Sequence, residues 1–292
     1  MTTFLGYAAR GQNSWWRYLA TPFAAIALFI ALATAILAFL IFSHLAPPNL
    51  TEEIKRPIHP AIFFASTGVM FGILLVSFAV AIRLLHGKRF GDIVGRWQWP
   101  LFFWGAAVWL ALQAALTLAD WVMAPHAFTV TLSAATPSLV IFAILGLSVQ
   151  TFAEEFVFRG YATQGLLLAL RRPWVVAVAS GLLFGALHIP NGIPQAVNAV
   201  FFGIVTAVIA IRTGGLAFTY GLHLVNNLWG AIIVVSANDV FKGAPGLLTQ
   251  KAPQLLGWDV AVGVVGLLIP LWLIAGPLKP RPEPEPLDAV FS

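Results

Sequence analysis

The sequence predicts an all-α membrane protein, a polytopic transmembrane helical bundle with about eight spans and both termini in the cytoplasm. Three observations predict this class. Of the 292 residues, 60% are apolar and only 9% are charged, whereas soluble domains carry about 25% charged residues. Apolar stretches of roughly 15–25 residues recur along the chain, the length that crosses about 30 Å of hydrocarbon. Lys and Arg are divided unevenly between the connecting segments, as the positive-inside rule requires.

The apolar stretches define the spans in order. They cover residues 18–43, 60–85, 99–122, 138–170, 174–188, 195–211, 214–236 and 257–276. The stretch 138–170 would be about 50 Å long as a helix, too long for one upright crossing. We therefore expect it to tilt, to kink or to continue past the membrane face. The stretch 174–188 is short, and Pro190 and Pro194, which disfavour helix continuation, follow it.

Basic residues set the predicted orientation. Eight spans place eleven Lys and Arg on one side and four on the other. The first set is Arg10, Arg17, Arg83, Lys88, Arg89, Arg96, Arg171, Arg172, Arg212, Lys279 and Arg281, and the second is Lys55, Arg56, Lys242 and Lys251. The richer side is the cytoplasmic one. The same scattering between spans accounts for the net charge of +5, so no nucleic-acid partner is expected.

We divide the chain into four segments. Residues 1–137 hold the first three helices and a basic cytoplasmic connection, and 138–236 hold helices four to seven. Residues 237–276 form the last loop and helix, and 277–292 form a proline-rich cytoplasmic tail that cannot become a helix. The absence of cysteine excludes disulfides, thiolate metal ligands and a cysteine nucleophile.

Polar residues inside the apolar spans mark the segment that carries the chemistry. They form three clusters, which are Glu154 with Glu155 and Arg159, then His188, then His223 with Asn227. An ionisable group at the bilayer centre costs at least roughly 2.5–3.5 kcal/mol, so such residues are rare and usually functional. The sequence therefore predicts a functional site within residues 138–236.

Helical spacing divides the first cluster into two roles. Glu155 and Arg159 are four residues apart in the favourable order for an internal ion pair, so we expect them to support the site. Glu154 points about 100° away from Glu155 on a helix and has no local cation. It is the candidate general base or metal ligand. The alternative is that both glutamates only hold the helices together through hydrogen bonds.

The other two clusters also have helical neighbours. His188 lies close to the stripe of Gly181 and Gly185, small residues that let an adjacent helix approach closely. His223 and Asn227 share one face of the seventh span, because they are four residues apart. A structural interpretation remains for each, since His and Asn commonly form interhelical hydrogen bonds in membranes.

If the three helices meet, the side chains could hydrolyse an acyl bond, such as a peptide, in two ways. Glu154, His188 and His223 are the ligand set of a catalytic zinc site with an open position for water. A divalent metal such as zinc is therefore one option. Alternatively, Glu154 and His188 activate a water directly, while His223 and Asn227 donate hydrogen bonds to the oxyanion. The sequence supports both alternatives.

The three motifs resemble those of a known family. They are Glu154-Glu155-x-x-x-Arg159, Phe184-x-x-x-His188 and His223-x-x-x-Asn227. In type, order and spacing they look like the signature of the CPBP family of intramembrane proteases, which includes the type II CAAX prenyl endopeptidases and bacterial Abi proteins. The resemblance covers about residues 138–236.

The resemblance implies a helical bundle around a cavity open to the cytosolic side. It implies that Glu154 and His188 activate the attacking water, and that His223 and Asn227 stabilise the oxyanion. The buried ion pair would then support the site. The usual family name is that of a metalloprotease, although the resemblance itself does not choose between a metal and a metal-independent glutamate.

We therefore predict an intramembrane endopeptidase that cleaves a membrane-associated or lipid-modified protein or peptide. It would be a multi-pass protein of the cytoplasmic membrane if bacterial, or of the endoplasmic reticulum membrane if eukaryotic. Its expected partners are the lipid bilayer and the substrate. Two alternatives are a proton-coupled transporter, in which buried carboxylates and histidines relay protons, and a non-catalytic membrane binding or bacteriocin-immunity protein.

Overall fold

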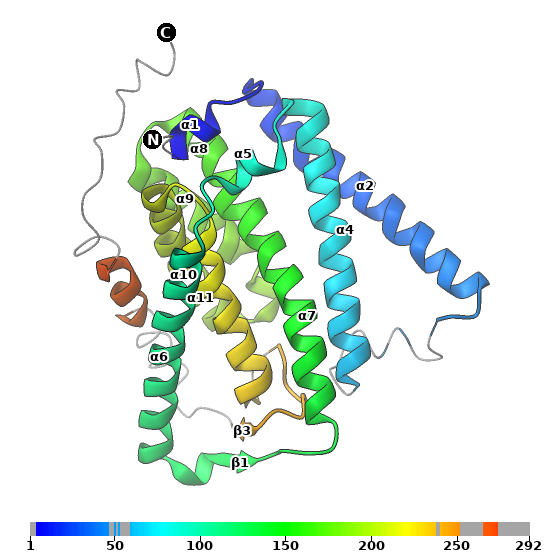
Figure 1. Ribbon diagram of the computed structural model, residues 1–292, viewed down its shortest axis with the longest axis vertical. Coiled ribbons are helices and arrows are strands. Elements are labelled where there is room, and N and C mark those ends of the chain that lie inside the picture. The colour runs from blue at the N-terminus through cyan, green and yellow to red at the C-terminus, as the bar shows by residue number, and fades with distance from the viewer. Residues whose placement is uncertain are drawn as a thin grey trace.

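A bundle of long helices makes up most of the protein (Figure 1). The computed structural model describes residues 4–46, 50, 52, 59–237, 240–251 and 265–273. The helices are α1 (Phe4–Ala8), α2 (Trp15–Phe42), α4 (Pro60–His86), α5 (Phe90–Val94), α6 (Trp99–Met123), η1 (Pro125–Ala127), α7 (Thr136–Glu154), η2 (Glu155–Ala162), α8 (Thr163–Leu170), α9 (Pro173–Ala186), η3 (Ile189–Asn191), α10 (Ile193–Thr213), α11 (Ala217–Leu228) and η4 (Trp229–Ile233). This arrangement confirms the prediction of a helical membrane protein.

Within the part of the chain that the structure describes, five helices are long and apolar enough to cross a membrane. They are Trp15–Phe42, Pro60–His86, Trp99–Met123, the continuous helix Thr136–Leu170 and Ile193–Thr213. α9 is apolar but shorter, and residues 265–273 are helical within the last predicted span. The rest of that span and the tail 277–292 lie outside the described residues. The number of eight crossings and the cytoplasmic termini stay predictions.

The fourth predicted span contains a change of helix type. It begins as α7, continues as the π-helix η2 and ends as α8, which gives 35 residues in all. A π-helix has i→i+5 hydrogen bonds and is rare, and it occurs frequently at functional sites. The regular α-helical geometry assumed from the sequence is therefore interrupted between Glu155 and Ala162. Glu155 and Arg159 both lie in the wider turns of η2.

Close approaches at glycine hold pairs of helices together. A Cβ atom on Gly203 of α10 would lie 2.7 Å from Gly181 Cα of α9, so these two helices touch where the small-residue stripe predicts. A Cβ atom on Gly68 of α4 would lie 3.0 Å from Gly146 Cα of α7. Small residues let backbones approach in this way in membranes. The α4–α7 and α9–α10 pairs thus position three helices of the motif-bearing segment.

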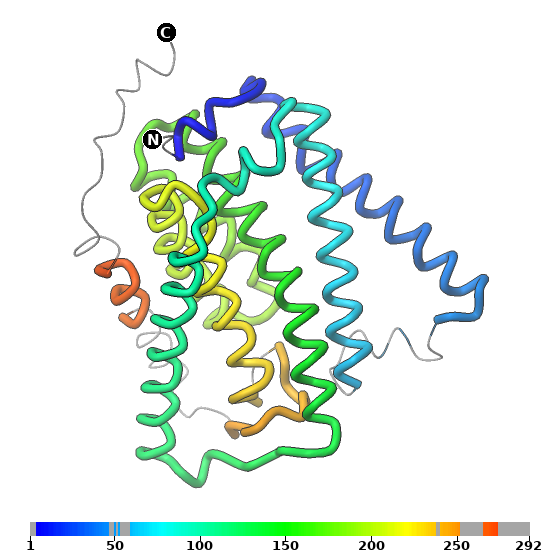
Figure 2. Tube along the Cα trace, viewed as in Figure 1, coloured from blue at the N-terminus to red at the C-terminus, as the bar shows by residue number. Residues whose placement is uncertain are grey.

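Helix α2 stands partly apart from the bundle. It leans away from α4 along most of its length (Figure 2). Thr21 and Ala25, near its N-terminal end, are its buried residues. The remainder is long and apolar, which suits a helix in contact with lipid. Its N-terminal end lies at the same end of the bundle as α1, α5 and α8 (Figure 1).

A small sheet lies at the opposite end of the bundle and adds a few strand residues to the otherwise helical fold. β1 (Phe128–Val130), β2 (Val234–Ser236) and β3 (Leu248–Gln250) pair in the order β1-β3-β2. β3 runs antiparallel to β1 and parallel to β2. The predicted helix 214–236 therefore ends as the π-helix η4 and then β2. Strands of three residues are too short to show a period-2 pattern.

Candidate active site

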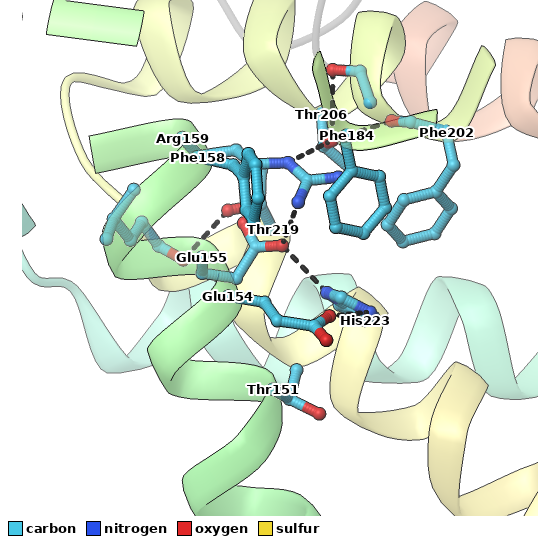
Figure 3. A network of polar contacts seen from close by, with 12 residues as sticks. Thr151, Glu154, Glu155, Phe158, Arg159, Phe184, Phe202, Thr206, Thr219 and His223 are labelled. Atoms are coloured by element: carbon cyan, nitrogen blue, oxygen red, sulfur yellow. Dashed lines mark hydrogen bonds and ion pairs between the residues drawn. The ribbon is translucent and has the colours of Figure 1, made fainter. Parts of the chain in front are cut away.

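His223 lies between two carboxylates at the centre of the buried polar network (Figure 3). Its Nδ1 atom is 2.8 Å from Glu155 Oε1, and its Nε2 atom is 3.5 Å from Glu154 Oε2. The two glutamates come from the junction of α7 and η2, and the histidine comes from α11. The Glu155 side chain is 0% exposed and that of Glu154 is 13% exposed. Glu154 is therefore the carboxylate that a substrate could reach.

The contact with Glu155 decides which nitrogen of His223 carries hydrogen. An ionised carboxylate can only accept hydrogen bonds. Glu155 lies beside the Arg159 guanidinium, which favours its ionised form. Nδ1 of His223 is thus the donor to Glu155, and Nε2 faces Glu154. A histidine oriented in this way can exchange a proton through its second nitrogen.

Arg159 is fully buried and confirms the predicted ion pair. Its Nη1 atom is 3.3 Å from Glu155 Oε1, and its Nε atom donates to Thr206 Oγ1 of α10 at 2.8 Å. The guanidinium also stacks on Phe184, whose ring centroid is 3.9 Å from Cζ. This cation–π contact compensates part of the cost of burying the charge.

The ion pair nevertheless leaves hydrogen-bonding capacity unused. Among the described residues, Glu155 Oε2 and Arg159 Nη2 have no hydrogen-bond partner. Buried polar atoms without partners are uncommon and costly, and those of a native structure need an explanation. A site that must bind further polar groups, such as a water or a substrate carbonyl, is one such explanation.

His188 reaches this network through Phe184. It follows the end of α9, its Nδ1 atom donates to the Phe184 carbonyl at 2.8 Å, and its ring lies 4.4 Å from the Phe184 ring. That bond leaves Nε2 with the lone pair of a neutral imidazole. Within the described part of the chain, no hydrogen bond or ion pair links His188 to Glu154 or His223. Water activation by Glu154 with His188 stays a prediction.

Asn227 faces α7. Its Nδ2 atom donates to Gln150 Oε1 at 3.0 Å and to Thr151 Oγ1 at 3.1 Å. A side-chain amide has two N–H donors, so both are engaged in this arrangement. The predicted contribution of Asn227 to an oxyanion hole is therefore untested, and in the structure the residue connects α11 with α7.

The predicted zinc ligands do not form a ready metal site. No three His, Cys, Asp or Glu side chains among the residues that the structure describes are placed so that they could hold a metal ion. Glu154 and His223 are close together, but both ring nitrogens of His223 already face carboxylates. A catalytic zinc site needs a ligand nitrogen directed at the metal from each histidine. The choice between a bound metal and direct use of the glutamate stays a prediction.

Several contributors to the network were not among the predicted site residues. Gln150 and Thr151 contact Asn227, Thr206 contacts Arg159, and Phe202 packs against His223 at a centroid distance of 4.9 Å. Gln150 could have been identified, because it lies one helical turn before Glu154. Phe202 and Thr206 gave no signal, since an apolar span always contains Phe and Thr on some face.

The fold and the site together define a class of protein. A helical membrane protein that buries a carboxylate–imidazole–carboxylate array has the groups of a membrane-embedded hydrolase. Residues 136–229 match the family model described as Type II CAAX prenyl endopeptidase Rce1-like. The match confirms the resemblance read from the three motifs, all of which it contains. The family that these residues match supports a CAAX-protease-like intramembrane peptidase, and the match covers less than half of the chain.

The similarity extends along most of the chain to a bacterial protein. The chain is 24% identical over 279 residues to the "Uncharacterized protein YyaK" of Bacillus subtilis (strain 168), which covers 90% of this chain and 93% of that protein. No solved structure matches the chain. The comparisons thus extend beyond the motif segment to the flanking helices.

Proposed function

We propose that this protein is an intramembrane endopeptidase that hydrolyses a peptide bond in a membrane-associated protein or peptide. The observation that carries the proposal is the Glu154–His223 pair, held inside membrane helices by Glu155 on the other side of the ring. Buried ionisable groups in membranes are usually functional. The match of residues 136–229 to the Rce1-like family supports the same reaction.

In the proposed reaction, Glu154 acts as the general base. Its carboxylate takes a proton from water while the water oxygen bonds to the carbonyl carbon of the peptide. The proton is shared between Glu154 Oε2 and His223 Nε2, which lie 3.5 Å apart. It is then delivered to the leaving nitrogen as the C–N bond breaks. Glu155 and Arg159 keep His223 in the required orientation.

Two further side chains are available for positioning the water and for binding the oxyanion. His188 presents Nε2 to the surroundings of the site, and Arg159 has a guanidinium nitrogen without a hydrogen-bond partner among the described residues. In this proposal an Arg159 N–H donates to the oxyanion and stabilises its developing negative charge, while His188 Nε2 accepts a hydrogen bond from the attacking water. We expect the His188→Ala variant to lose cleavage while it remains folded.

The decisive experiment is cleavage of a peptide library by the purified protein reconstituted in liposomes. The Glu154→Gln variant should lose at least about 100-fold in kcat, the scale of general acid–base catalysis, and should keep its thermal stability. Asp120→Asn, which neutralises a carboxylate on α6 outside the site, is the matched control and should cleave normally. Retained cleavage by Glu154→Gln would refute Glu154 as the general base, whereas no cleavage by the wild type would favour the non-catalytic or transport alternatives.

Cleavage by the purified protein before and after removal of bound metal distinguishes the metal-dependent mechanism from the glutamate mechanism. The glutamate mechanism predicts that cleavage persists after extensive chelation. Loss of cleavage on chelation, with recovery on added zinc, would instead support a site formed by Glu154, His188 and His223. That result would require these three side chains to rearrange from the positions described above.

A further inference from the structure

Four hydrogen bonds run in series from a tryptophan on α6 to Glu154. Trp109 Nε1 donates to Asn226 Oδ1 at 3.1 Å, and Asn226 Nδ2 donates to Asn227 Oδ1 at 3.2 Å. Asn227 Nδ2 donates to Gln150 Oε1 at 3.0 Å, and Gln150 Nε2 donates to Glu154 Oε1 at 2.5 Å. These five side chains, from α6, α11 and α7, are called the amide relay below.

The two ends of the amide relay fix its direction. The indole N–H of Trp109 can only donate a hydrogen bond, and an ionised carboxylate can only accept one. Each amide between them has one oxygen and one NH₂ group, so it accepts on one side and donates on the other. A flipped amide anywhere in the series would place two donors or two acceptors against each other. The hydroxyl of Thr151 agrees with this direction, since it also donates to Gln150 Oε1.

The surroundings strengthen the amide relay. Trp109 is only 6% exposed and packs against Phe202 at a ring-centroid distance of 6.0 Å, so its hydrogen bond is shielded from water and lipid. In a medium of low dielectric constant, successive hydrogen bonds polarise one another. An unpaired amide in the same place would be costly, so the series favours one arrangement of all its members.

We propose that the amide relay positions Glu154 for catalysis, with Trp109, Asn226 and Gln150 as positioning residues. The inference rests on the proposed function, because it assigns these residues to the general base of that reaction. Glu154 Oε1 accepts from Gln150, so the proton that Glu154 removes from water binds at Oε2. That oxygen is the one 3.5 Å from His223 Nε2. The relay thus selects the carboxylate oxygen that handles the proton.

The Asn226→Leu variant tests the amide relay at its middle. Leucine has the same branched arrangement of heavy atoms as asparagine but neither donates nor accepts, and position 226 is three hydrogen bonds away from Glu154. We expect kcat to fall about tenfold, which corresponds to the loss of one net hydrogen bond, while KM stays unchanged. Trp109→Phe, which removes only the donor at the start of the series, should act in the same direction. Trp104→Phe, on the exposed side of α6, is the matched control and should leave kcat unchanged.

Combining variants separates positioning from general loss of packing. The double variant Asn226→Leu with Trp109→Phe should have a kcat no lower than that of the more impaired single variant. The reason is that either change alone already interrupts the amide relay. Asn226→Leu with Trp104→Phe should behave as Asn226→Leu alone. Unchanged kcat in both single variants, or strictly multiplicative losses with a raised KM, would overturn the relay. The same non-additive pattern is expected in the decrease of Tm, which needs no cleavage. Wild-type protein that cleaves nothing would refute the proposed function, and the Tm pattern would still decide the relay.

Discussion

Two buried polar clusters share the π-helix η2, and they differ in what their side chains bind. The site cluster contains Glu154, Glu155, Arg159 and His223, which contact one another. The second cluster, called the N-terminal cluster here, contains Tyr18, His86, Lys88 and Tyr161. Arg159 and Tyr161 are two residues apart in η2, so this one segment takes part in both.

The N-terminal cluster binds backbone carbonyls. His86 Nδ1 donates to Gln12 O at 2.7 Å, and Lys88 Nζ donates to Ala8 O at 2.7 Å. Both side chains are almost completely buried. His86 Nε2 is then the acceptor for the Tyr161 hydroxyl at 3.0 Å. These bonds fasten the N-terminal segment to the ends of α4 and η2.

The difference separates structural polar burial from the polar burial that we propose serves catalysis. Side chains of the N-terminal cluster satisfy backbone groups that a chain segment would otherwise leave unpaired, as expected of a structural role. Side chains of the site cluster bind each other and leave Glu155 Oε2 without a hydrogen-bond partner among the described residues. Local violations of good hydrogen bonding are expected at functional sites. The helix η2 thus connects to the N-terminal segment through one set of side chains and contributes side chains to the proposed site through another.

The largest expected loss of stability comes from replacing Arg159 in the site cluster. Arg159→Leu leaves the Glu155 carboxylate buried without a cation, which should cost about 3–5 kcal/mol of stability. Thermal unfolding in detergent measures this loss. Glu155→Gln combined with Arg159→Leu should recover most of it, because no lone charge remains buried. Full stability of the single Arg159→Leu variant would contradict the assignment of the pair as a buried ion pair.

A smaller effect, with a defined pH dependence, is expected at Lys88 in the N-terminal cluster. Burial lowers the pKa of Lys88 from its ordinary value of 10.5 to about 8. Between these two pH values the unfolded chain keeps a proton that the folded protein has lost, so stability rises with pH. The rise over the whole window is on the order of 3 kcal/mol.

The measurement is the Tm of wild type and Lys88→Met from pH 7 to pH 10. The wild type should gain stability relative to the variant as the pH rises above about 8, because the variant has no ammonium group to deprotonate. Parallel pH profiles of the two proteins would show that Lys88 does not titrate in this range. Cleavage by Lys88→Met should stay close to that of the wild type, since the N-terminal cluster is structural.

The smallest loss of stability is expected at the Arg10–Asp92 ion pair, which lies next to the N-terminal cluster. Arg10 Nη1 lies 2.7 Å from Asp92 Oδ1, but its side chain is 47% exposed. Exposed ion pairs contribute about 0.2–1 kcal/mol. Arg10→Ala should therefore lower Tm only slightly, and less at high salt because the pair is screened. A loss as large as that of Arg159→Leu would show that both clusters hold the fold in the same way.

Much of the site was predictable because its parts are local. The ion pair of Glu155 and Arg159 follows from a four-residue spacing, and the stripe of Gly181 and Gly185 predicts the close α9–α10 contact that the structure has. The helical spans follow from length and apolarity alone. These features need no knowledge of how distant segments meet.

The convergence of Glu154 and Glu155 on one imidazole was not predictable. Their separation by about 100° on an α-helix suggested that only one of them would face His223. The π-helix that begins at Glu155 changes that geometry, and both carboxylates contact the ring. A change of helix type has no compositional signature, since it depends on the contacts of the helix with its neighbours.

By itself, the sequence determined a helical membrane protein, the order of its main helices and the six polar residues that carry its proposed chemistry. Tertiary structure alone decided that His223 lies between two glutamates, that Trp109 is linked to Glu154, and that a small sheet closes one end. The physical reason is that membrane helices are apolar on all sides. Their hydrophobic pattern therefore does not specify how each helix is rotated about its axis, and only the packed bundle fixes which polar side chains meet.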